Sequence, residues 1–332
     1  MKFRRSVVVG ITAALVLTLS AFAPSAQAAN PIRVGVAYDA GGPGDHSFAD
    51  AVAKGLVMAK KRFQIQVTAT VTIGSDADRE LRLRSLVAKD CNPIIAVGSS
   101  YSSAVKNVAL DFPSTQFVIV NDASISMLNV TSLVFSENQG GYLAGVTAAL
   151  ASRTGKIGLV GTQSSLYETG FTAGAHDVKK DITVDARYGP DASVVLTNGL
   201  ISAGSDVIFL TTVGSDSDVL NAVVKANKTN KSGIKVGLIL IEPDQYVTLP
   251  MGAKKYILAS LVKRVDRAIV DVIAESSSGR TVIDVLDANL GIYGRRYGIQ
   301  NGGIELSLWS PRVSKYRKVI NSAAAKAAKL SL

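Results

Sequence analysis

The chain has 332 residues, 47% of them hydrophobic and 19% charged, a length and composition typical of a globular protein with two domains and not of a disordered one. Its single cysteine, Cys91, excludes an internal disulfide and a cysteine-based zinc site. Two isolated histidines, His46 and His176, argue against a metalloenzyme, and the sequence contains neither an H-E-x-x-H motif nor a Walker-type phosphate loop.

The first thirty residues have the pattern of a secretory signal peptide. Three of the first five residues are basic, an apolar run over 7–23 follows, and small residues surround Ala28. We therefore expect cleavage after Ala28, removal of the signal peptide over 1–28, and export of the remaining chain; an uncleaved anchor helix is the alternative. No cysteine lies near the cleavage site, so a lipidated amino terminus is not expected.

The basic residues are spread along the chain. Without the signal segment, 33 basic and 26 acidic residues remain, a net charge of +7. No basic stripe interleaved with aromatic residues occurs, so nucleic acid is not predicted as a partner. The densest basic cluster lies in an Ala-rich helical pattern near the carboxyl terminus and comprises Lys315, Arg317, Lys318, Lys326 and Lys329. It indicates a solvated surface helix or a weak attraction to anionic polymers of the cell envelope.

Taken in chain order, short apolar runs rich in β-branched residues alternate with longer helical patterns. The strand-like runs are Ile32–Tyr38, Val67–Ile73, Ile94–Val97, Phe117–Val120, Ile157–Val160, Val207–Leu210 and Val236–Ile241. The helical candidates include Ser47–Phe63, Asp76–Lys89, Ser102–Leu110, Gly141–Ala151, Asp218–Asn227 and Ser260–Ala274. Continuous apolar strands that alternate with helices predict parallel sheets covered on both faces, the α/β class.

The strand-like runs fall into two series, separated by a helical pattern rich in small residues over 139–152. Two Rossmann-like lobes are therefore expected, with a small ligand in the cleft between them. We assign residues 31–139 plus 253–288 to the amino-terminal lobe. Residues 140–252 plus 289–332 are assigned to the carboxyl-terminal lobe.

A glycine-rich segment over 39–50 follows the first strand and opens a helix. Such a loop places backbone N–H groups and a helix amino terminus at the cleft, where they can bind a ligand. A structural explanation is also open, in which Ser47 and Asp50 form a capping box and the glycines form the turn. Phe48, an aromatic residue at the helix start beside a carboxylate-rich loop, favours the binding role.

The pattern formed by Asp39, Gly41, Asp45, Ser47 and Phe48 resembles the basic membrane protein (PnrA-like) family. Its members are extracytoplasmic substrate-binding proteins of ABC transporters that bind purine nucleosides. The similarity continues in order over nearly the whole chain, at 94–98, 112–122, 135–145, 158–174, 206–209, 237–245 and 260–263. It implies the type I periplasmic-binding-protein fold with a hinge between the lobes. It also implies a membrane permease as partner, no cofactor and no catalysis.

A nucleoside presents two flat faces, a polar base edge and a ribose diol. The resemblance assigns an aromatic sandwich to Phe48 from one lobe and Tyr167 from the other. Stacking on an aromatic ring contributes about 1–3 kcal/mol per base, and closing the lobes would assemble the sandwich, which couples binding to hinge motion. Without the resemblance, Tyr167 is interpreted as an aromatic residue of a surface loop.

For the base edge the family uses an acidic residue after its fourth strand, where this chain has Asn121 followed by Asp122. An amide both donates and accepts hydrogen bonds, so the base preference is expected to differ from that of the family. An Asx-turn after the strand is the alternative explanation of this pair. The family also commonly has Asn where this chain has Ala49, which removes one polar contact with the ligand.

For the ribose diol, Glu242 and Lys263 match the family's acid and lysine, with Asp244 as the fallback. The family's acid is usually Asp, and the extra methylene of Glu moves the carboxylate by about 1.5 Å. Without the resemblance, Lys263 is interpreted as part of a solvated helix face. In the segment 211–218 the family has a glycine-rich turn, of which only Gly214 remains, so we expect a narrower or reshaped wall.

Two other functions stay open at this stage. An exported nucleoside hydrolase would need a metal cluster or an activated nucleophile; Asp39 and Asp45 offer a base, but the sequence shows no partner constellation. A binding protein of the same fold for a sugar or an autoinducer-like ligand is the second alternative.

Overall fold

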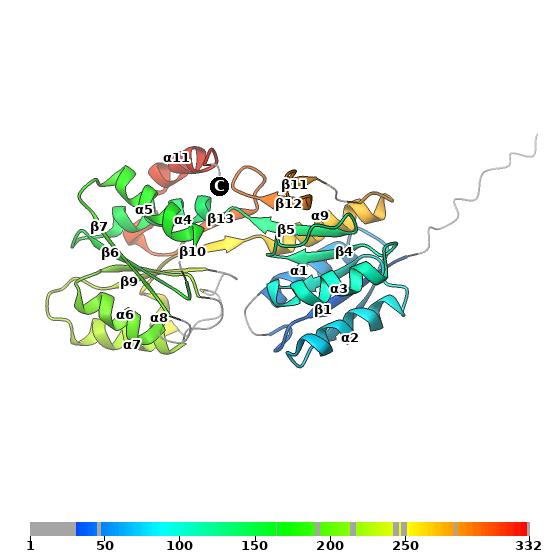
Figure 1. The fold of residues 1–332 in the computed structure, drawn as a ribbon. Coiled ribbons are helices and arrows are strands. Elements are labelled where there is room, and N and C mark those ends of the chain that lie inside the picture. Colours follow the sequence, from blue (N-terminus) through cyan, green and yellow to red (C-terminus); the bar gives the residue numbers. More distant parts are fainter. Residues whose placement is uncertain are drawn as a thin grey trace, which may run out of the picture. The chain divides into compact units, whose positions relative to one another are not determined.

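The computed structural model describes residues 31–44, 48–163, 165–189, 193–212, 217–241, 246, 251–281 and 284–330. The predicted signal peptide lies outside the described residues. Pro31–Leu332 form one compact unit, in which the described strands build two sheets flanked by helices (Figure 1). None of the described helices combines the length and the apolar composition that crossing a membrane requires.

The first sheet has seven strands in the order β11-β12-β5-β4-β3-β1-β2. Neighbouring strands are parallel except β11 and β12. Their bounds are β1(Ile32–Tyr38), β2(Ile65–Val71), β3(Ile94–Val97), β4(Phe117–Val120), β5(Val130–Phe135), β11(Val285–Asp287) and β12(Ile292–Tyr297).

The second sheet has six strands in the order β13-β10-β9-β8-β6-β7. Only β13 runs antiparallel to its neighbour in this sheet. The strands are β6(Lys156–Gly161), β7(Thr183–Tyr188), β8(Val207–Leu210), β9(Gly237–Ile241), β10(Ile257–Lys263) and β13(Ile304–Leu308).

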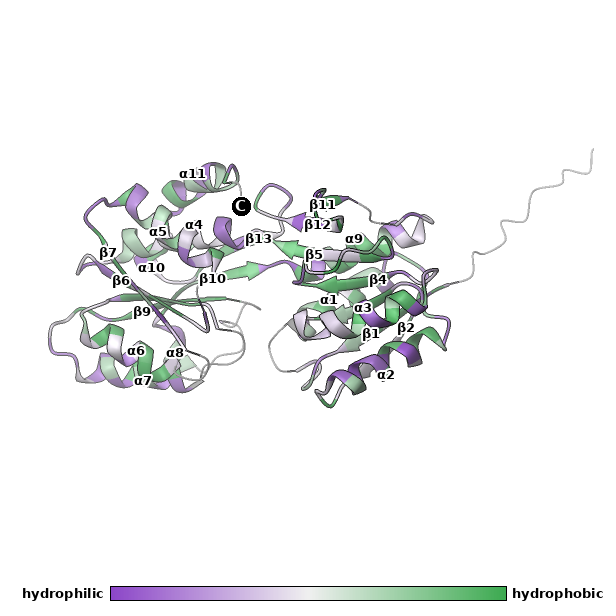
Figure 2. Ribbon diagram, viewed as in Figure 1, coloured by the Kyte–Doolittle hydropathy of each residue, from purple (hydrophilic) through white to green (hydrophobic). Residues whose placement is uncertain are grey.

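Strands of the first sheet bury side chains on both faces. Val34 and Val36 of β1 belong to the core that includes α1(Phe48–Lys60) and α9(Val265–Ser277). Ala37 belongs to the core of the other face, which includes α2(Asp76–Val87) and α3(Ser102–Asp111). Because both faces are covered, the strands carry continuous apolar runs, and they are predominantly green in the hydropathy colouring (Figure 2).

The second sheet is also covered on both faces. Its residues Ile157 and Phe209 pack in the core that includes α4(Glu137–Ala151) and α5(Leu166–Val178). Ile208 and Leu238 pack on the opposite face. The remaining helices of this half of the chain are α6(Ser193–Ser202), α7(Ser217–Thr229), α8(Met251–Lys254), α10(Pro311–Ser314) and α11(Arg317–Ala327).

The predicted α/β class with two lobes is confirmed, and four of the strand-like runs coincide with β1, β3, β4 and β8. The predicted helix Ser260–Ala274 is wrong in its first part, because β10 extends to Lys263 and α9 begins at Val265. Ala259, Ser260 and Leu261 are completely buried between neighbouring strands. A short apolar run of this kind fits a strand and a helix equally well by its pattern.

Two strands correct the division of the chain into lobes. β10 pairs with β9 and β13 of the second sheet, although residues 253–288 were assigned to the amino-terminal lobe. β12 pairs with β5 of the first sheet, although 289–332 were assigned to the carboxyl-terminal lobe. The physical reason is that strand pairing joins segments far apart in sequence, and the apolar pattern of one strand does not specify its partner.

Helices α4 and α5 pack backbone to backbone through glycines spaced four residues apart. A Cβ atom at Gly145 of α4 would lie 2.0 Å from the carbonyl oxygen of Phe171, and one at Gly170 of α5 would lie 2.0 Å from that of Asn138. Gly141 and Gly174 have contacts of the same kind. This interface fixes the first turn of α5 beside the first turn of α4.

We predict that Gly145→Ala destabilises the protein by about 1–3 kcal/mol, because a methyl group at this position overlaps a backbone carbonyl that cannot rotate away. The clash outweighs the better helix propensity of alanine, about 1 kcal/mol. Chemical denaturation of both proteins measures the free energy of unfolding. The matched control is Gly252→Ala in α8, where nothing lies within 4 Å of the added Cβ; equal stability of the two variants would contradict the packing argument.

Candidate functional site

The candidate site lies where the carboxyl ends of parallel strands from both sheets meet. Asn121 directly follows β4, and Glu137 begins α4 two residues after β5 ends. Lys263 is the last residue of β10 in the second sheet. Its ammonium Nζ donates a hydrogen bond of 3.2 Å to Asn121 Oδ1, so side chains from the two sheets touch here. The carboxyl ends of parallel strands are the usual location of ligand sites in α/β folds.

Lys263 is the centre of a set that we call the lysine cluster: Asn121, Phe135, Glu137, Tyr167 and Lys263. The Lys263 side chain is 4% exposed, and its Nζ forms an ion pair of 2.8 Å with Glu137 Oε1. The ammonium also lies 5.4 Å from the ring centre of Tyr167 and 5.9 Å from that of Phe135. A buried ammonium group is stable only with such partners.

Glu137 neutralises the buried charge of Lys263, and its own side chain stays partly in contact with solvent, 24% exposed. It lies in the first turn of α4, where the helix dipole favours a negative charge. The lysine cluster thus brings a cation, a carboxylate and an amide to one place. Together they offer both donors and acceptors to a polar ligand.

The two aromatic rings of the lysine cluster are held by further aromatic contacts. Tyr167 is 4% exposed, and its ring meets that of Phe209 edge-on at a centroid distance of 5.7 Å. Phe135 stacks on Tyr297 at 5.5 Å. Tyr167 is therefore a buried residue in the first turn of α5 and not the surface-loop aromatic of the alternative interpretation.

Asn121 and Asp122, which follow β4, make different contacts. Asn121 has a left-handed backbone with φ of 63°, a conformation that Asn tolerates better than most residues. Asp122 accepts hydrogen bonds from the backbone N–H and the hydroxyl of Ser124, and its other oxygen accepts one from the Ser102 hydroxyl at 2.8 Å. Asp122 thus forms the Asx-turn of the alternative explanation, while Asn121 contacts Lys263.

Asp39 follows β1 and is bound by Arg79 of α2, which donates to Asp39 Oδ1 from Nη2 at 2.9 Å. The Ser100 hydroxyl donates to the other carboxylate oxygen. Burial favours a higher pKa for Asp39, but the hydrogen bonds from Ser100 and Arg79 outweigh it, so the pKa lies below its ordinary value. This ion pair fixes the start of the glycine-rich loop, in which Asp50 Oδ1 accepts from the Gly44 N–H at 2.7 Å.

Several predicted site residues lie outside the described residues. They are Asp45, Ser47, the side chain of Phe48, Gly214, Glu242 and Asp244. Their proposed contacts with a ligand stay predictions. The choice between a ligand-binding role and a capping box for the glycine-rich loop is likewise untested.

Sequence reasoning missed Glu137, Phe135 and Arg79. Glu137 follows a strand that was not assigned from the sequence, although the apolar run Val130–Phe135 could have revealed it. Arg79 lies in a helix whose alternating charges resemble an exposed surface, and only the fold brings it to Asp39. No three His, Cys, Asp or Glu residues within the described parts of the chain lie close enough together to hold a metal ion.

Solved structures identify the fold. A transcriptional activator of the comK gene from Bacillus halodurans aligns with a TM-score of 0.73 and 21% identity, covering 90% of this chain and 98% of that one. A solute-binding protein of an ABC transporter system from Aeropyrum pernix K1 aligns with a TM-score of 0.68 and 23% identity, covering 91% and 82%. The fold is that of type I periplasmic-binding-protein-like solute-binding proteins.

Residues 32–329 match the family model of PnrA-like ABC transporter substrate-binding proteins, and the chain belongs to this family. The nucleoside-binding protein BmpA of an ABC transporter from Lactococcus lactis is 28% identical over 305 residues, covering 86% of this chain and 84% of the relative. A CD4+ T-cell-stimulating antigen from Listeria monocytogenes is 30% identical over 271 residues, covering 76% of each. The family comprises substrate-binding proteins and not enzymes.

We predict that Asp39→Asn lowers the melting temperature at neutral pH by roughly 1–3 °C, because it weakens the contact with Arg79. The folded-state pKa of Asp39 is below the ordinary 3.8. Its stabilisation is therefore complete above that pH and is lost as the pH falls through the folded-state pKa. The difference between the two proteins should shrink below about pH 4, as thermal unfolding at several pH values would measure.

The matched control is Asp111→Asn, which removes a more exposed ion pair with Arg84. It should change the melting temperature less than Asp39→Asn does. A difference for Asp39→Asn that stays constant into strongly acidic solution would contradict the assignment.

Proposed function

We propose that this chain is the extracytoplasmic receptor of an ABC importer, that it binds a nucleoside between its lobes, a purine nucleoside foremost, and that it delivers this ligand to a membrane permease. Three observations support the ligand class: the family, the similarity to the nucleoside-binding protein BmpA of Lactococcus lactis, and the lysine cluster. The signal-peptide pattern at the amino terminus supports the extracytoplasmic location.

The observation that carries the proposal is the position of Lys263. Its ammonium is buried among oxygens of Asn121 and Glu137 and the rings of Phe135 and Tyr167. A nucleoside joins the two kinds of chemistry found around this ammonium, since its base is a flat π-system and its ribose carries hydroxyl groups.

In the bound state we expect the base to stack on Tyr167, with Phe48 as the opposing ring. The ammonium that now lies over Tyr167 would then shift toward the ribose oxygens, which accept its hydrogen bonds as Glu137 does. Glu242 or Asp244 would accept hydrogen bonds from the diol. Asn121 would contact the polar edge of the base.

Isothermal titration with inosine, guanosine, adenosine, thymidine, free hypoxanthine, ribose and arabinose tests the ligand class. The proposal expects purine nucleosides to bind more tightly than ribose or the free base by at least about tenfold, because only they fill both halves of the site. Binding of sugars but not nucleosides would make the chain a sugar receptor. Chromatography of the same mixtures would reveal a hydrolase by release of the free base.

We predict that Lys263→Met weakens nucleoside binding by about tenfold to a hundredfold and affects free bases less, because the charged donor to the ribose is lost. Methionine keeps most of the volume and the apolar contacts of the lysine stem. The single variant also leaves Glu137 without its cation, so it should lose stability.

The double variant Lys263→Met with Glu137→Gln separates these two effects. It removes the whole ion pair, so it should recover stability while nucleoside binding stays weak. Nucleoside affinity equal to that of the unmodified protein in this stable double variant would overturn the site.

We predict that Asn121→Asp raises the preference for inosine and guanosine over adenosine by about threefold to tenfold. A carboxylate only accepts hydrogen bonds, and inosine and guanosine carry a ring N–H donor where adenosine has an acceptor. Aspartate also tolerates the left-handed backbone of this position. Competition titrations measure the ratio of the affinities for inosine or guanosine and for adenosine. An unchanged ratio would show that Asn121 does not contact the base edge.

A further inference from the structure

The amino-terminal ends of the second sheet's parallel strands form an edge opposite the lysine cluster. Strands β6, β7, β8, β9 and β10 are parallel, so the loops that precede them lie side by side at this edge. β13 is antiparallel to β10 and brings the chain back to the same edge. A hydrogen bond of 2.9 Å from the backbone N–H of Trp309 to the carbonyl oxygen of Leu258 confirms this return.

These loops, at 152–156, 179–182, 203–206, 230–236, 255–256 and 309–316, contain nine Lys or Arg residues and two acids. We call this set of loops the basic edge. Its exposed cations include Arg153, Lys156, Lys179, Lys180, Lys235 and Lys255. Of the acids, Asp181 is exposed, and Asp206 is 2% exposed and paired with Arg312.

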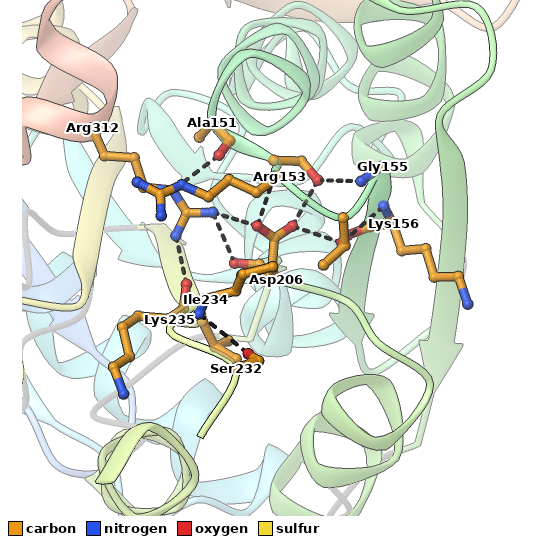
Figure 3. Close-up of polar contacts among 12 residues, drawn as sticks. Ala151, Arg153, Gly155, Lys156, Asp206, Ser232, Ile234, Lys235 and Arg312 are labelled. Atoms are coloured by element: carbon orange, nitrogen blue, oxygen red, sulfur yellow. Dashed lines mark hydrogen bonds and ion pairs between the residues drawn. The ribbon is translucent and has the colours of Figure 1, made fainter. Parts of the chain in front are cut away.

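The Asp206–Arg312 pair holds the loops of the basic edge together (Figure 3). Asp206 accepts hydrogen bonds from Arg312 at 2.6 Å, from the Ser152 hydroxyl at 2.6 Å and from the Arg153 N–H at 2.8 Å. Arg312 also donates to the carbonyl oxygen of Lys235 at 2.6 Å. The side chains of Lys156 and Lys235 extend away from this network (Figure 3), so one buried acid organises the loops while their exposed charge stays positive.

The corresponding edge of the first sheet has mixed charge. Asp90 pairs with Arg33 at this edge. Lys60, Lys61 and Arg62 form an exposed basic group before β2. Positive charge is therefore concentrated along one edge of the second sheet and is not a general consequence of the basic composition.

We propose that the basic edge binds a linear polymer of phosphates, of the kind found in cell envelopes, while the lysine cluster at the opposite edge binds its own ligand. The cations follow the strand order from β7 to β13, a row of roughly 24 Å for six strands spaced about 4.8 Å apart. A row of this length matches several consecutive phosphates of one chain. Stable binding to a bilayer would require apolar insertion in addition to charge.

The Trp309 ring at this edge is partly buried within the protein and does not favour nucleic acid. Trp309 stacks on Tyr246 with ring centroids 4.2 Å apart and planes inclined by 4°, so each ring has one face covered by the other. The Trp309 indole N–H donates to the Ser260 hydroxyl at 3.0 Å. Binding of single-stranded nucleic acid usually relies on aromatic faces on which bases stack.

Fluorescence titration of the purified protein with long-chain inorganic polyphosphate tests the proposal. The variant R153Q/K179Q/K180Q should bind about tenfold or more weakly at low salt. The slope of log affinity against log salt should fall by roughly 2–3, because fewer cations contact phosphate. The control K60Q/K61Q/R62Q changes the net charge equally on the first sheet and should keep the affinity and slope of the unmodified protein. Nucleoside titration verifies that both variants stay folded and retain the other site.

Three outcomes would overturn the proposal. Equal losses in both triple variants would show that only the net charge matters. Tighter binding of single-stranded DNA with the same number of phosphates would make the edge a nucleic-acid surface. Binding to phosphatidylglycerol vesicles that polyphosphate does not displace would make it a membrane surface.

Discussion

The contact of α4 with α5 is the constraint on which the candidate site depends. Glycines at this interface allow the two backbones to approach until no Cβ atom would fit. Tyr167 lies in the first turn of α5 and Glu137 begins α4, so this approach sets the separation between an aromatic ring and a carboxylate. Larger residues at the interface would push the helices apart and separate the two groups that flank the Lys263 ammonium.

The parallel arrangement of the second sheet separates two kinds of chemistry. Its carboxyl edge ends in Lys263, a buried cation whose charge is satisfied by Glu137 and aromatic faces. Its amino edge carries exposed cations around a single buried acid, Asp206. Because all strands of this sheet but β13 run in the same direction, the loops that precede them and the loops that follow them lie at opposite edges. A ligand at one edge and a polymer at the other would therefore bind without competing for the same side chains.

The sequence predicted well what depends on local pattern. Runs such as Ile94–Val97 are apolar on both faces because helices cover both sides of the sheet, and this periodicity is readable in one dimension. Strand pairing cannot be read in this way, because nothing in the sequence of β10 or β12 specifies which sheet the strand joins. Lys263 was found through the family resemblance and not through its pattern, which suggested an exposed helix. Glu137 was missed because its role appears only when β4, β5 and β10 end side by side.

The two contacts of Lys263 differ in what they connect. Its partner Glu137 lies on α4, which packs on β10 and β13 of the same sheet as the lysine. Asn121 follows β4 of the first sheet, and the 3.2 Å contact to it joins the two sheets. If the sheets moved apart, the ammonium would lose the amide and keep the carboxylate, so the buried charge would never be without a partner. The longer hydrogen bond, from the ammonium to the uncharged amide of Asn121, is therefore the one that a ligand could replace at small cost. A ribose or base oxygen accepts the same hydrogen bond. This asymmetry makes the Asn121 side of the lysine cluster the point at which binding and movement of the lobes would be coupled.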